Sequence, residues 1–385
     1  MLTDLAEDAA MSGWHATVMT SDSLRNRTSP RLPRQEVRNG VTIVRIRTPR
    51  FERFGLLGRA ADSIAFVLGV VRRLLLGRRH DVVVALTDPP LIVALTVMIS
   101  RARRMRTIYW IHDLFPQIAG ALGVLKINGI TYRILNGIAR AATARCDLVI
   151  ALGEYMSRRA IEAGASAGRI TVVPNWADTT SIRPLAQSES RLTNSLRVKG
   201  KFVVLYSGNV GRAHTFGSTI EAARRLIDQP DIVFLFIGRG PRLSELTFAA
   251  AQGVKNLRFA EPVARDQLVE ALATGSVSLV TEDPRVAGLV VPSKTYGILA
   301  SGRPIVFIGS RESDVASLVR RHNCGAVLAD NDIDGLVAVL RAWYNNPDEV
   351  AVLGRNARAA ASHYSRGICT LRWLQAAESL VARPA

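Results

Sequence analysis

Cysteine is scarce in this chain. Among 385 residues there are three cysteines, Cys146, Cys324 and Cys369, an odd and widely scattered set. A disulfide framework needs paired cysteines and a cysteine metal cluster needs closely spaced ones. The pattern therefore excludes both kinds of site and indicates a reducing compartment.

Long hydrophobic runs are also missing. The apolar segment 64–71 is too short to span a bilayer, and the longer segment 82–100 is interrupted by Asp88-Pro89-Pro90. A membrane-spanning helix needs about 20 consecutive apolar residues. We expect none in this chain, and we find no internal repeat or low-complexity tail.

Negative charge is in deficit. Lys and Arg number 50 against 32 Asp and Glu, and residues 1–185 alone hold 26 basic and 14 acidic side chains. Such an excess suggests an anionic partner, for which nucleic acid, an acidic membrane or a phosphorylated substrate are the candidates. No nucleic-acid-binding motif is present, so we expect no nucleic acid partner. A general preference for arginine is the alternative explanation.

What the chain has in abundance is alternating strand and helix patterns. Its length fits two domains of about 190 residues. The clearest unit is an apolar run, Gly288–Val291, then a short helix, a break at Gly302-Arg303-Pro304 and a β-branched run, Ile305–Ile308. This strand–loop–helix–turn–strand order is typical of a parallel sheet in an α/β fold.

The loop of that unit predicts an anion site. Ser293 stands where a helix N-cap is expected and Lys294 follows it. Free backbone N–H groups, a hydroxyl and an ammonium can converge there on a phosphate. The alternative is a capped helix with a solvated lysine.

A glycine-rich loop predicts a second phosphate contact. The strand 202–207 leads into Gly208, Asn209, Gly211 and Arg212, and a helix follows from about Ser218. Glycines let the backbone approach a diphosphate, and the Arg212 guanidinium can bind its oxygens.

A histidine and an aspartate follow another strand. The run 107–111 delivers His112 and Asp113 to the carboxyl edge of the sheet, where ligands gather in open α/β folds. We interpret the pair as catalytic, for proton handling or for contact with a substrate hydroxyl. A histidine that only caps the loop is the alternative.

The segment 60–76 reads as a helix that is apolar nearly all round, and we predict that it is buried on the sheet. A membrane-facing patch is the alternative, with Phe51, Phe54, Leu56 and Leu57 in the bilayer interface and arginines on anionic head groups.

The motif around Pro292, Lys294, Tyr296, Gly302 and Pro304 resembles the nucleotide-sugar-binding segment of the large family of retaining glycosyltransferases with the GT-B fold. It is most similar to the bacterial branch that builds surface polysaccharides and O-antigen units. The resemblance implies two Rossmann-like, doubly wound parallel-sheet domains facing a cleft. A terminal helix crosses back to the first domain.

A second landmark, Pro174-Asn175-Trp176-Ala177-Asp178, is similar to the segment that closes the first domain in this family. We expect an N-terminal acceptor domain at 1–178, a hinge at 179–200, a nucleotide-sugar domain at 201–365 and a returning helix at 366–385. Relatives open with one further strand that has no counterpart here, so we expect either a start codon assigned too late or a domain that lacks this strand.

The resemblance also implies site residues. Gly238 lies in a turn similar to one near the nucleotide base, and Pro292, Ser293, Lys294 and Tyr296 fall in the donor segment. Glu282 is a candidate donor-sugar contact, although a solvated loop acid is the alternative.

One departure from the family is clear. Many relatives carry two glutamates, one of which holds the nucleotide ribose, at the positions of Gly297 and Leu289. The paired-carboxylate signature is therefore absent from this sequence.

We therefore expect a hexosyl- or N-acetylhexosaminyltransferase that uses a nucleoside diphosphate sugar, most simply a UDP-sugar, and retains the anomeric configuration. The acceptor is a lipid-linked or other glycan. No cofactor or metal is expected, because no Asp-x-Asp metal site appears and Arg212 and Lys294 can neutralise the diphosphate.

We expect a cytoplasmic protein, peripheral on the inner face of the cell membrane, with an anionic membrane surface as a candidate partner. A nucleotide-sugar 2-epimerase and a non-catalytic binding subunit stay open as alternatives.

Overall fold

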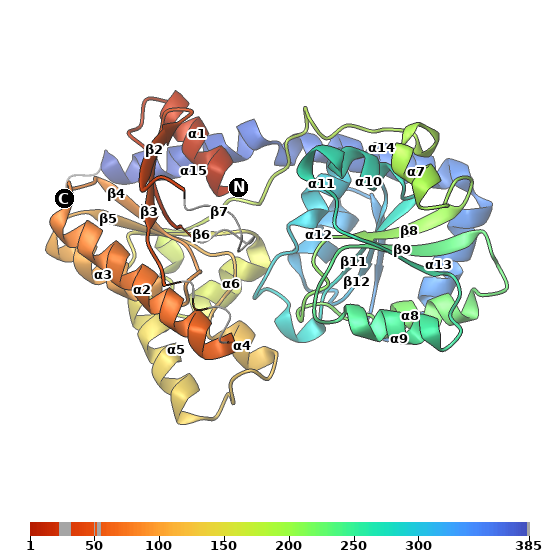
Figure 1. Cartoon of the computed structure of the whole chain (residues 1–385), viewed down its shortest axis with the longest axis horizontal. Helices are drawn as coiled ribbons and strands as arrows, with labels where there is room; N and C mark the ends of the chain where they lie inside the picture. Colours follow the sequence, from red (N-terminus) through yellow and green to blue (C-terminus); the bar gives the residue numbers. More distant parts are fainter. Residues whose placement is uncertain (23–31, 50, 52–54, 383–385) are drawn as a thin grey trace.

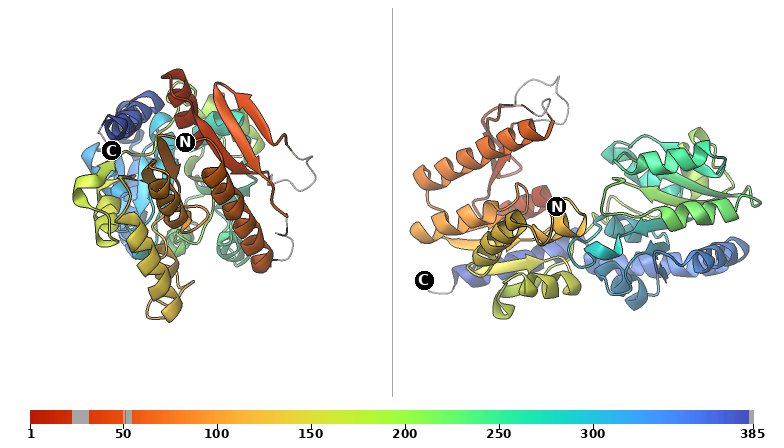
Figure 2. Two further views of the ribbon diagram at one scale, coloured as in Figure 1. Left: turned by 90° about the vertical axis from the view of Figure 1, so that its left-hand side faces the viewer. Right: turned by 90° about the horizontal axis from the view of Figure 1, so that it is seen from below.

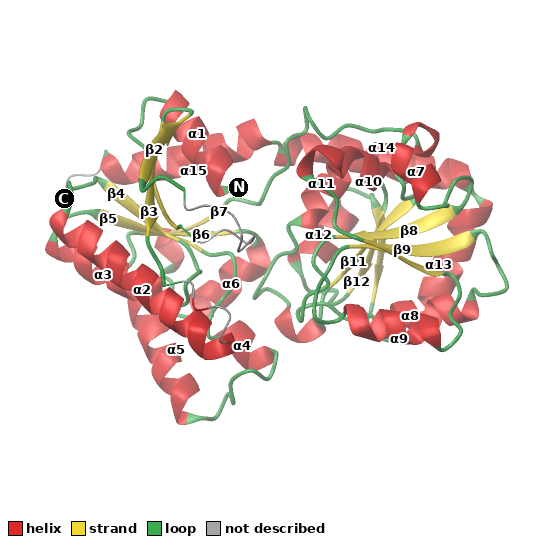
Figure 3. Ribbon diagram, in the orientation of Figure 1, coloured by secondary structure: helices red, strands yellow, loops and turns green. Residues whose placement is uncertain are grey.

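The computed structural model describes residues 1–22, 32–49, 51 and 55–382 of the chain. It has two α/β halves, each with strands enclosed by helices (Figures 1 and 3). Among the described residues, no helix is both long and apolar enough to cross a membrane.

The N-terminal half begins with a helix and a small sheet. Helix α1 (Leu2–Met11) leads into β1 (Thr17–Ser21), which pairs in parallel with β3 (Val41–Ile46). Strand β2 (Gln35–Arg38) is antiparallel to β3. The turn between β2 and β3 has positive φ at both Asn39 and Gly40, which is the backbone that a tight hairpin requires.

The remainder of this half is a parallel sheet of order β4-β5-β6-β7 with its helices. In chain order its elements are α2 (Gly55–Leu76), β4 (Val82–Ala85), α3 (Ile92–Ala102), β5 (Arg106–Trp110), α4 (Gln117–Ala121), α5 (Ile130–Thr143), β6 (Leu148–Ala151), α6 (Glu154–Glu162) and β7 (Ile170–Val172).

The two N-terminal sheets do not join within the described residues. Strands β1 and β4 are each at the edge of their sheet. They line one apolar cavity of about 260 Å³, together with residues of α1 and α15 (Arg366–Val381). The strands of this half therefore form two separate sheets among the described residues, where one doubly wound sheet was expected.

The C-terminal half has a single six-stranded sheet. Its order is β10-β9-β8-β11-β12-β13, and every pairing is parallel. The chain order reverses between β8 and β11, so the carboxyl ends of these two strands flank the crevice where ligands bind in such sheets.

The remaining elements complete this half and the segment before it. They are α7 (Arg191–Ser195), β8 (Phe202–Ser207), α8 (Gly217–Arg225), β9 (Ile232–Ile237), α9 (Leu243–Ala251), β10 (Leu257–Ala260), α10 (Leu268–Ala273), β11 (Val277–Thr281), α11 (Lys294–Ala300), β12 (Ile305–Ile308), α12 (Asp314–Arg321), β13 (Gly325–Leu328), α13 (Ile333–Asn345) and α14 (Pro347–Ala361).

Two expectations about local structure are wrong. The run Gly288–Val291 is a loop, not a strand, and its apolar Leu289 and Val291 are buried against the other half. Helix α2 is not buried all round, because Ile64 and Leu68 are about 60% exposed. In both cases apolar side chains are present, but local periodicity does not reveal which surface they meet.

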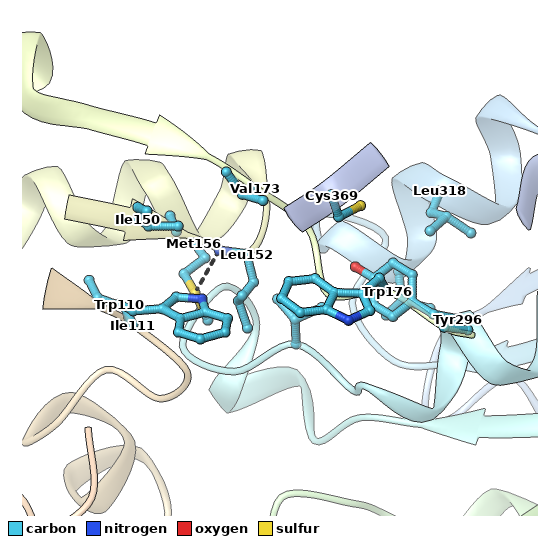
Figure 4. Close-up of a cluster of buried hydrophobic side chains, with 14 of the residues drawn as sticks. Trp110, Ile111, Ile150, Leu152, Met156, Val173, Trp176, Tyr296, Leu318 and Cys369 are labelled. Carbon is cyan, nitrogen blue, oxygen red and sulfur yellow. Dashed lines mark hydrogen bonds between the residues drawn. The ribbon is translucent and has the colours of Figure 1, made fainter. Parts of the chain in front are cut away.

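A hydrophobic cluster joins the halves. Trp110 and Trp176 stack with their ring centroids 5.8 Å apart. Tyr296 and Leu318 of the C-terminal half and Cys369 of α15 lie in the same cluster (Figure 4). The carboxyl ends of the two large sheets are therefore held together by buried contacts as well as by the connecting chain.

Helix α15 crosses back to the N-terminal half, as predicted. It packs against α1 and β5, and it begins with Arg366, whose guanidinium contacts Glu7 at 3.2 Å and Asp8 at 2.7 Å. Arg366 also donates to the backbone oxygen of Asp4 at 3.3 Å.

We predict that Arg366→Ala lowers the free energy of unfolding by about 1–2 kcal/mol. Hydrogen bonds between ionised groups contribute about 1.5–3 kcal/mol, and solvent screening reduces this for a part-exposed network. Thermal unfolding measures the change. Arg372→Ala, an exposed position on the same helix, should stay within about 0.5 kcal/mol of wild type. Equal effects of the two substitutions would contradict the assigned role of Arg366.

Candidate active site

Loops from the carboxyl edge of the C-terminal sheet meet at one place. The loop after β8 is hydrogen-bonded to the turn after β9, with the Val210 N–H donating to the Arg239 backbone oxygen at 2.9 Å. The loop after β11 joins the same group, with Asp283 N–H donating to the Ala213 oxygen at 2.9 Å. Three strand ends thus form one continuous backbone surface facing the other half.

Glycine at 238 makes this arrangement possible. A Cβ placed on Gly238 would lie 1.9 Å from the carbonyl oxygen of Gly208, far inside van der Waals contact. Gly208 itself has φ of 133°, a backbone conformation that L side chains rarely adopt. The sequence therefore requires glycine at both positions for the two loops to pack together.

The Lys294 ammonium lies beside this surface in an unusual state. Its nitrogen is 3.5 Å from the centroid of the Tyr206 ring, and a Cβ on Gly208 would be 3.7 Å from it. Lys294 as a residue is half-buried, but its nitrogen has no solvent contact and no hydrogen-bond partner among the described residues. Burial lowers the pKa of Lys294 from 10.5 to about 7.

Two other residues predicted to bind the nucleotide sugar, Pro292 and Ser293, directly precede this lysine. Pro292 is buried and its oxygen accepts a hydrogen bond from the Thr295 hydroxyl at 2.8 Å. Ser293 holds the N-cap position of α11, but its exposed side chain makes no capping bond. The predicted N-cap position of Ser293 is confirmed, while its side chain makes no capping hydrogen bond.

The glycine-rich loop carries the next group of predicted residues. The backbone oxygen of Asn209 accepts from the Tyr206 hydroxyl at 2.8 Å, and Gly211 packs against the Asn209 side chain. Arg212 is exposed in this loop, and no ion pair joins it to any residue that the structure describes. The Gly208 loop and the Lys294 corner therefore adjoin, with Arg212 projecting from the loop.

Tyr296 lies beneath the site instead of on its surface. Its ring is 4% exposed and meets the ring of Tyr364 edge-on at 5.3 Å. Gly297, at the position of the ribose-binding glutamate of relatives, faces Ile182. Leu289 is buried at the domain junction. No carboxylate replaces the missing pair at these two positions.

Glu282 directly follows β11 at this edge of the sheet. It is 1% exposed, and its Oε2 has no partner among the described residues. Burial, with the negative charge of Asp314 as a smaller cause, raises the pKa of Glu282 to about 8, although a hydrogen bond with Ser313 opposes the shift. The interpretation of Glu282 as a solvated loop acid is therefore wrong.

The N-terminal half contributes His112 and Asp113, at the end of β5. Both line a cavity of about 1200 Å³, together with Asp88 and Asp62. Burial lowers the pKa of His112 to about 4, and its Nε2 has no partner among the described residues. Burial, and then the charge of Asp88, raises the pKa of Asp113. At neutral pH His112 is an uncharged imidazole whose Nε2 is buried and unpaired.

Two contacts bring these groups to the C-terminal site. Asp113 and Val290 form an isolated β-bridge, and Leu114 N–H donates to the Leu289 oxygen at 2.9 Å. The loop carrying His112 is therefore joined to the loop that leads, four residues later, into Lys294.

On the other side, the carboxylate of Asp314 accepts from the backbone N–H groups of Tyr155 and Met156, at 3.0 and 3.1 Å. An aspartate of the C-terminal half thus caps α6 of the N-terminal half. The cap joins the two halves at their junction.

Sequence reasoning missed three contributors. Tyr206 forms the face on which the Lys294 ammonium lies. His214 contacts the Thr281 oxygen at 2.5 Å, and burial, then the charge of Lys294, lowers its pKa to about 4. Asp314 acts across the cleft. No local motif marks them, because each depends on a partner distant in the sequence.

In the part of the chain that the structure describes, no group of three His, Cys, Asp or Glu side chains is arranged to hold a metal ion.

Two family models match the chain, one for each half. A model described as "Glycosyl transferase 4-like domain" matches residues 1–176, and one described as "Glycosyl transferases group 1" matches residues 201–346. Together they cover most of the chain and leave residues 177–200 between them.

Curated relatives agree with these matches. The "Probable glycosyltransferase WbjE" of Pseudomonas aeruginosa is 27% identical over 287 residues, which are 74% of this chain and 71% of that protein. The "Putative colanic acid biosynthesis glycosyl transferase WcaI" of Escherichia coli (strain K12) is 28% identical over 250 residues, 63% of this chain and 61% of that protein.

Solved structures share the fold at low identity. Sucrose-phosphate synthase of Thermosynechococcus elongatus aligns over 99% of this chain and 92% of its own, with a TM-score of 0.75 and 16% identity. WaaG, a glycosyltransferase involved in lipopolysaccharide biosynthesis, aligns over 100% of this chain and 95% of its own. Its TM-score is 0.69 and its sequence identity is 17%. Anabaena HepE in complex with UDP-glucose aligns over 90% of this chain and 87% of its own. Its TM-score is 0.68 and its sequence identity is 18%.

The buried ammonium predicts a gain in stability when Lys294 is replaced by Met. The pKa of Lys294 is about 7 in the folded protein and 10.5 in the unfolded chain. Below pH 7 the lysine is charged in both states, so the folded state is destabilised by the full cost of burying the charge. The cost shrinks as pH rises toward 10.5. Removing an unpaired buried polar group should raise the free energy of unfolding by roughly 1–3 kcal/mol. The lost attraction between the ammonium and the Tyr206 ring reduces this gain.

Thermal unfolding at pH 6.5 checks this. We expect a rise of roughly 2–4 °C in Tm per kcal/mol, and a smaller rise at pH 10. Lys255→Met, at an exposed lysine, serves as the control and should change Tm little. A lower Tm for Lys294→Met would mean that the ammonium stabilises the free protein.

Proposed function

The chain belongs to the group 1 glycosyltransferases and has their GT-B fold, and from this membership we propose that it transfers a sugar from a nucleoside diphosphate sugar to a lipid-linked or other glycan acceptor. UDP is the nucleotide we propose, and the product is part of a cell-surface polysaccharide. The predicted family and fold are confirmed by the matches to both halves.

The observation that carries the proposal is the unpartnered Lys294 ammonium beside the Gly208 loop. A buried donor without a partner is costly, and a hydrogen bond to a charged group is worth about 1.5–3 kcal/mol. The diphosphate of a nucleotide sugar supplies anionic oxygens for this donor. A bound diphosphate would give the Lys294 ammonium a charge-assisted hydrogen bond.

The same lysine suits the chemistry of transfer. When the glycosidic bond to the diphosphate breaks, negative charge develops on the leaving oxygen, and a positioned cation there lowers the barrier. Arg212, at the exposed rim of the loop, can add a second cation. We therefore propose that transfer proceeds without a metal, with Lys294 and Arg212 balancing the diphosphate charge.

His112 and Asp113 serve the acceptor side in this proposal. They line the 1200 Å³ cavity of the N-terminal half, and the Asp113–Val290 bridge holds that cavity against the donor corner. A neutral imidazole can exchange a hydrogen bond with a sugar or acceptor hydroxyl without adding charge. Glu282, a buried carboxyl at the end of β11, is the proposed donor-sugar contact, and we propose that the configuration at the anomeric carbon is retained.

Relatives and neighbours support the substrate classes. HepE is described in complex with UDP-glucose, which supports a UDP-hexose as the donor. The names of WcaI and WaaG place those proteins in colanic acid and lipopolysaccharide biosynthesis. We propose a comparable place for this chain, at the cytoplasmic face of the cell membrane.

Incubation of the purified protein with a panel of UDP- and GDP-sugars, with and without lipid-linked acceptors, tests the proposal. Release of the nucleoside diphosphate with formation of a glycosylated acceptor supports transfer. Conversion of the nucleotide sugar to an epimer would instead support the epimerase alternative, and binding without turnover the non-catalytic one.

We predict that Lys294→Ala lowers donor turnover by at least about 100-fold, because loss of one preorganised donor to a developing anion costs about that much. Nucleoside diphosphate release measures it, and circular dichroism checks that the fold is intact. Lys255→Ala is the matched control. Activity close to wild type in Lys294→Ala would refute the role of this lysine.

His112→Ala should impair transfer while leaving UDP binding nearly unchanged, since His112 lies on the acceptor side. We expect a fall in turnover of about 100-fold or more and a UDP dissociation constant within about twofold of wild type. Kinetics and calorimetric titration separate the two effects. His363→Ala, at an exposed histidine, is the control, and a parallel loss of UDP binding would place His112 at the donor.

A further inference from the structure

A second large cavity lies on the C-terminal half, away from Lys294. Its volume is about 720 Å³, which is within the range of pockets that bind small molecules. Three of its lining residues stand where strands begin: Phe202 begins β8, Ser276 directly precedes β11 and Pro304 directly precedes β12. The cavity therefore lies at the amino edge of the six-stranded sheet, and the proposed donor site lies at the carboxyl edge.

Helices α13 and α14 contribute one wall of the cavity. They are consecutive in the chain and pack together along one side of this half (Figure 2). Trp343 and Tyr344 of α13 line the cavity, and the Tyr344 ring meets the Phe202 ring edge-on, with 6.1 Å between centroids. Pro304 and Val350 also line it. These side chains give an apolar ring system a surface on which to pack.

The charged side chains of the cavity are all positive. Of the described residues that line it, three are arginines, Arg303, Arg355 and Arg358, and none is Asp or Glu. No ion pair joins any of the three to a residue that the structure describes. Arg355 is exposed on α14. The cavity therefore carries positive charge that the surrounding protein does not balance.

Two of these arginines are bonded to neutral backbone oxygens. Arg303 donates to the oxygens of Leu185 and Ala273, at 2.6 and 3.0 Å, and Arg358 donates to the oxygen of Ala300 at 2.8 Å. The Nε of Arg303 is buried and has no hydrogen-bond partner among the described residues. Carbonyl oxygens orient the guanidinium groups, but they do not neutralise the charge.

Most uncharged polar side chains of the cavity are already bonded within the protein. The Gln187 amide donates to two backbone oxygens, at 2.8 and 3.2 Å. The Trp343 indole donates to Glu349 at 3.1 Å, and the Ser276 hydroxyl oxygen accepts from the Val203 N–H at 3.1 Å. The arginines are therefore the polar groups best able to bind a ligand, and they favour an anion over a neutral polar molecule.

We propose that this cavity binds a small aromatic phosphate, that is, an apolar ring system that carries a phosphate group. The ring packs on the aromatic and aliphatic side chains, and the phosphate binds the guanidinium groups, whose planar donors match its oxygens. A phosphate near neutral pH carries more negative charge than a carboxylate, which suits three arginines. A second copy of the chain docked through the same surface would bring like charges together.

The cavity adjoins the segment that connects the two halves. Pro184 and Gln187 of that segment line it, and Ala300, which accepts the hydrogen bond from Arg358, ends α11. The same helix begins at Lys294 and has seven residues, which span about 10 Å. A ligand in the cavity would lie at the far end of α11 from the proposed donor site, so it would not compete with a nucleotide there.

Calorimetric titration of the full chain with 1-naphthyl phosphate tests the proposal. We expect one site with a dissociation constant of about 1 mM or tighter, given the size of this probe. Inorganic phosphate and 1-naphthol each carry only one of the two features and should bind at least about tenfold more weakly. Equal binding of 1-naphthol would contradict the role of the arginines, and equal binding of inorganic phosphate would contradict the role of the apolar wall.

Two substitutions at exposed positions of α14 locate the probe. Ala351→Trp fills the cavity and Arg355→Glu reverses one of its charges, so each should weaken binding at least about tenfold. The matched controls are Val352→Trp, on the same helix but outside the cavity lining, and Arg372→Glu, at an exposed arginine of α15. Both controls should bind like wild type, and thermal unfolding checks that every variant is folded.

Binding of the probe at the proposed donor site is the main alternative. Lys294→Ala should therefore retain the affinity for 1-naphthyl phosphate, and saturating UDP should not displace the probe. Loss of binding in Lys294→Ala, displacement by UDP or absence of binding to the wild-type chain would each overturn the second site. Unchanged affinity in both Ala351→Trp and Arg355→Glu would do the same.

The second site does not depend on the proposed function. Release of nucleoside diphosphate from sugar nucleotides is measured on the same protein. A chain that binds 1-naphthyl phosphate in the cavity but turns over no sugar nucleotide would refute the proposed function and leave this site standing. A chain that turns over a sugar nucleotide but fails the binding tests would refute the site alone.

Discussion

The site depends on one unsatisfied charge. Lys294 places its ammonium on the ring of Tyr206, out of contact with water and without a hydrogen-bond partner among the described residues. In the free protein this state is unfavourable, which is why burial lowers the pKa so far. Proteins tolerate such strain mainly where a ligand relieves it. The rest of the C-terminal half supports the lysine: glycines let two loops pack together beside it, and α11 begins at it.

The junction between the halves joins the Lys294 corner to the cavity that contains His112. A loop that packs Leu289 and Val291 into the shared core also bridges Val290 to Asp113 and then leads directly into Lys294. On the other side, Asp314 caps α6. The Lys294 corner and the cavity that contains His112 are therefore fixed by the same short segments, and a change in the angle between the halves would alter both at once.

Much of this could be predicted from sequence, and the failures have a common cause. Strand and helix alternation indicated two parallel-sheet domains, and motifs located Lys294, Gly208 and the His112–Asp113 edge. The run Gly288–Val291 was predicted to be a strand because short apolar runs look alike whether they pair or pack. Helix α2 was predicted to be buried, although its outer stripe is exposed in the part of the chain that the structure describes. The ring of Tyr206, the core position of Tyr296 and the cap by Asp314 depend on contacts between distant residues, which local patterns do not encode.

The most direct test of the central claim is the pKa of Lys294, measured by NMR titration of the lysine Cε signals with and without UDP. The chain has only five lysines, at 126, 199, 201, 255 and 294, so assignment by substitution is practical. The account predicts that one lysine titrates near pH 7 in the free protein and that UDP raises its pKa by two or more pH units, roughly 3 kcal/mol or more of coupling. Five lysines that all titrate near pH 10.5, or a Lys294 signal that does not respond to UDP, would contradict it.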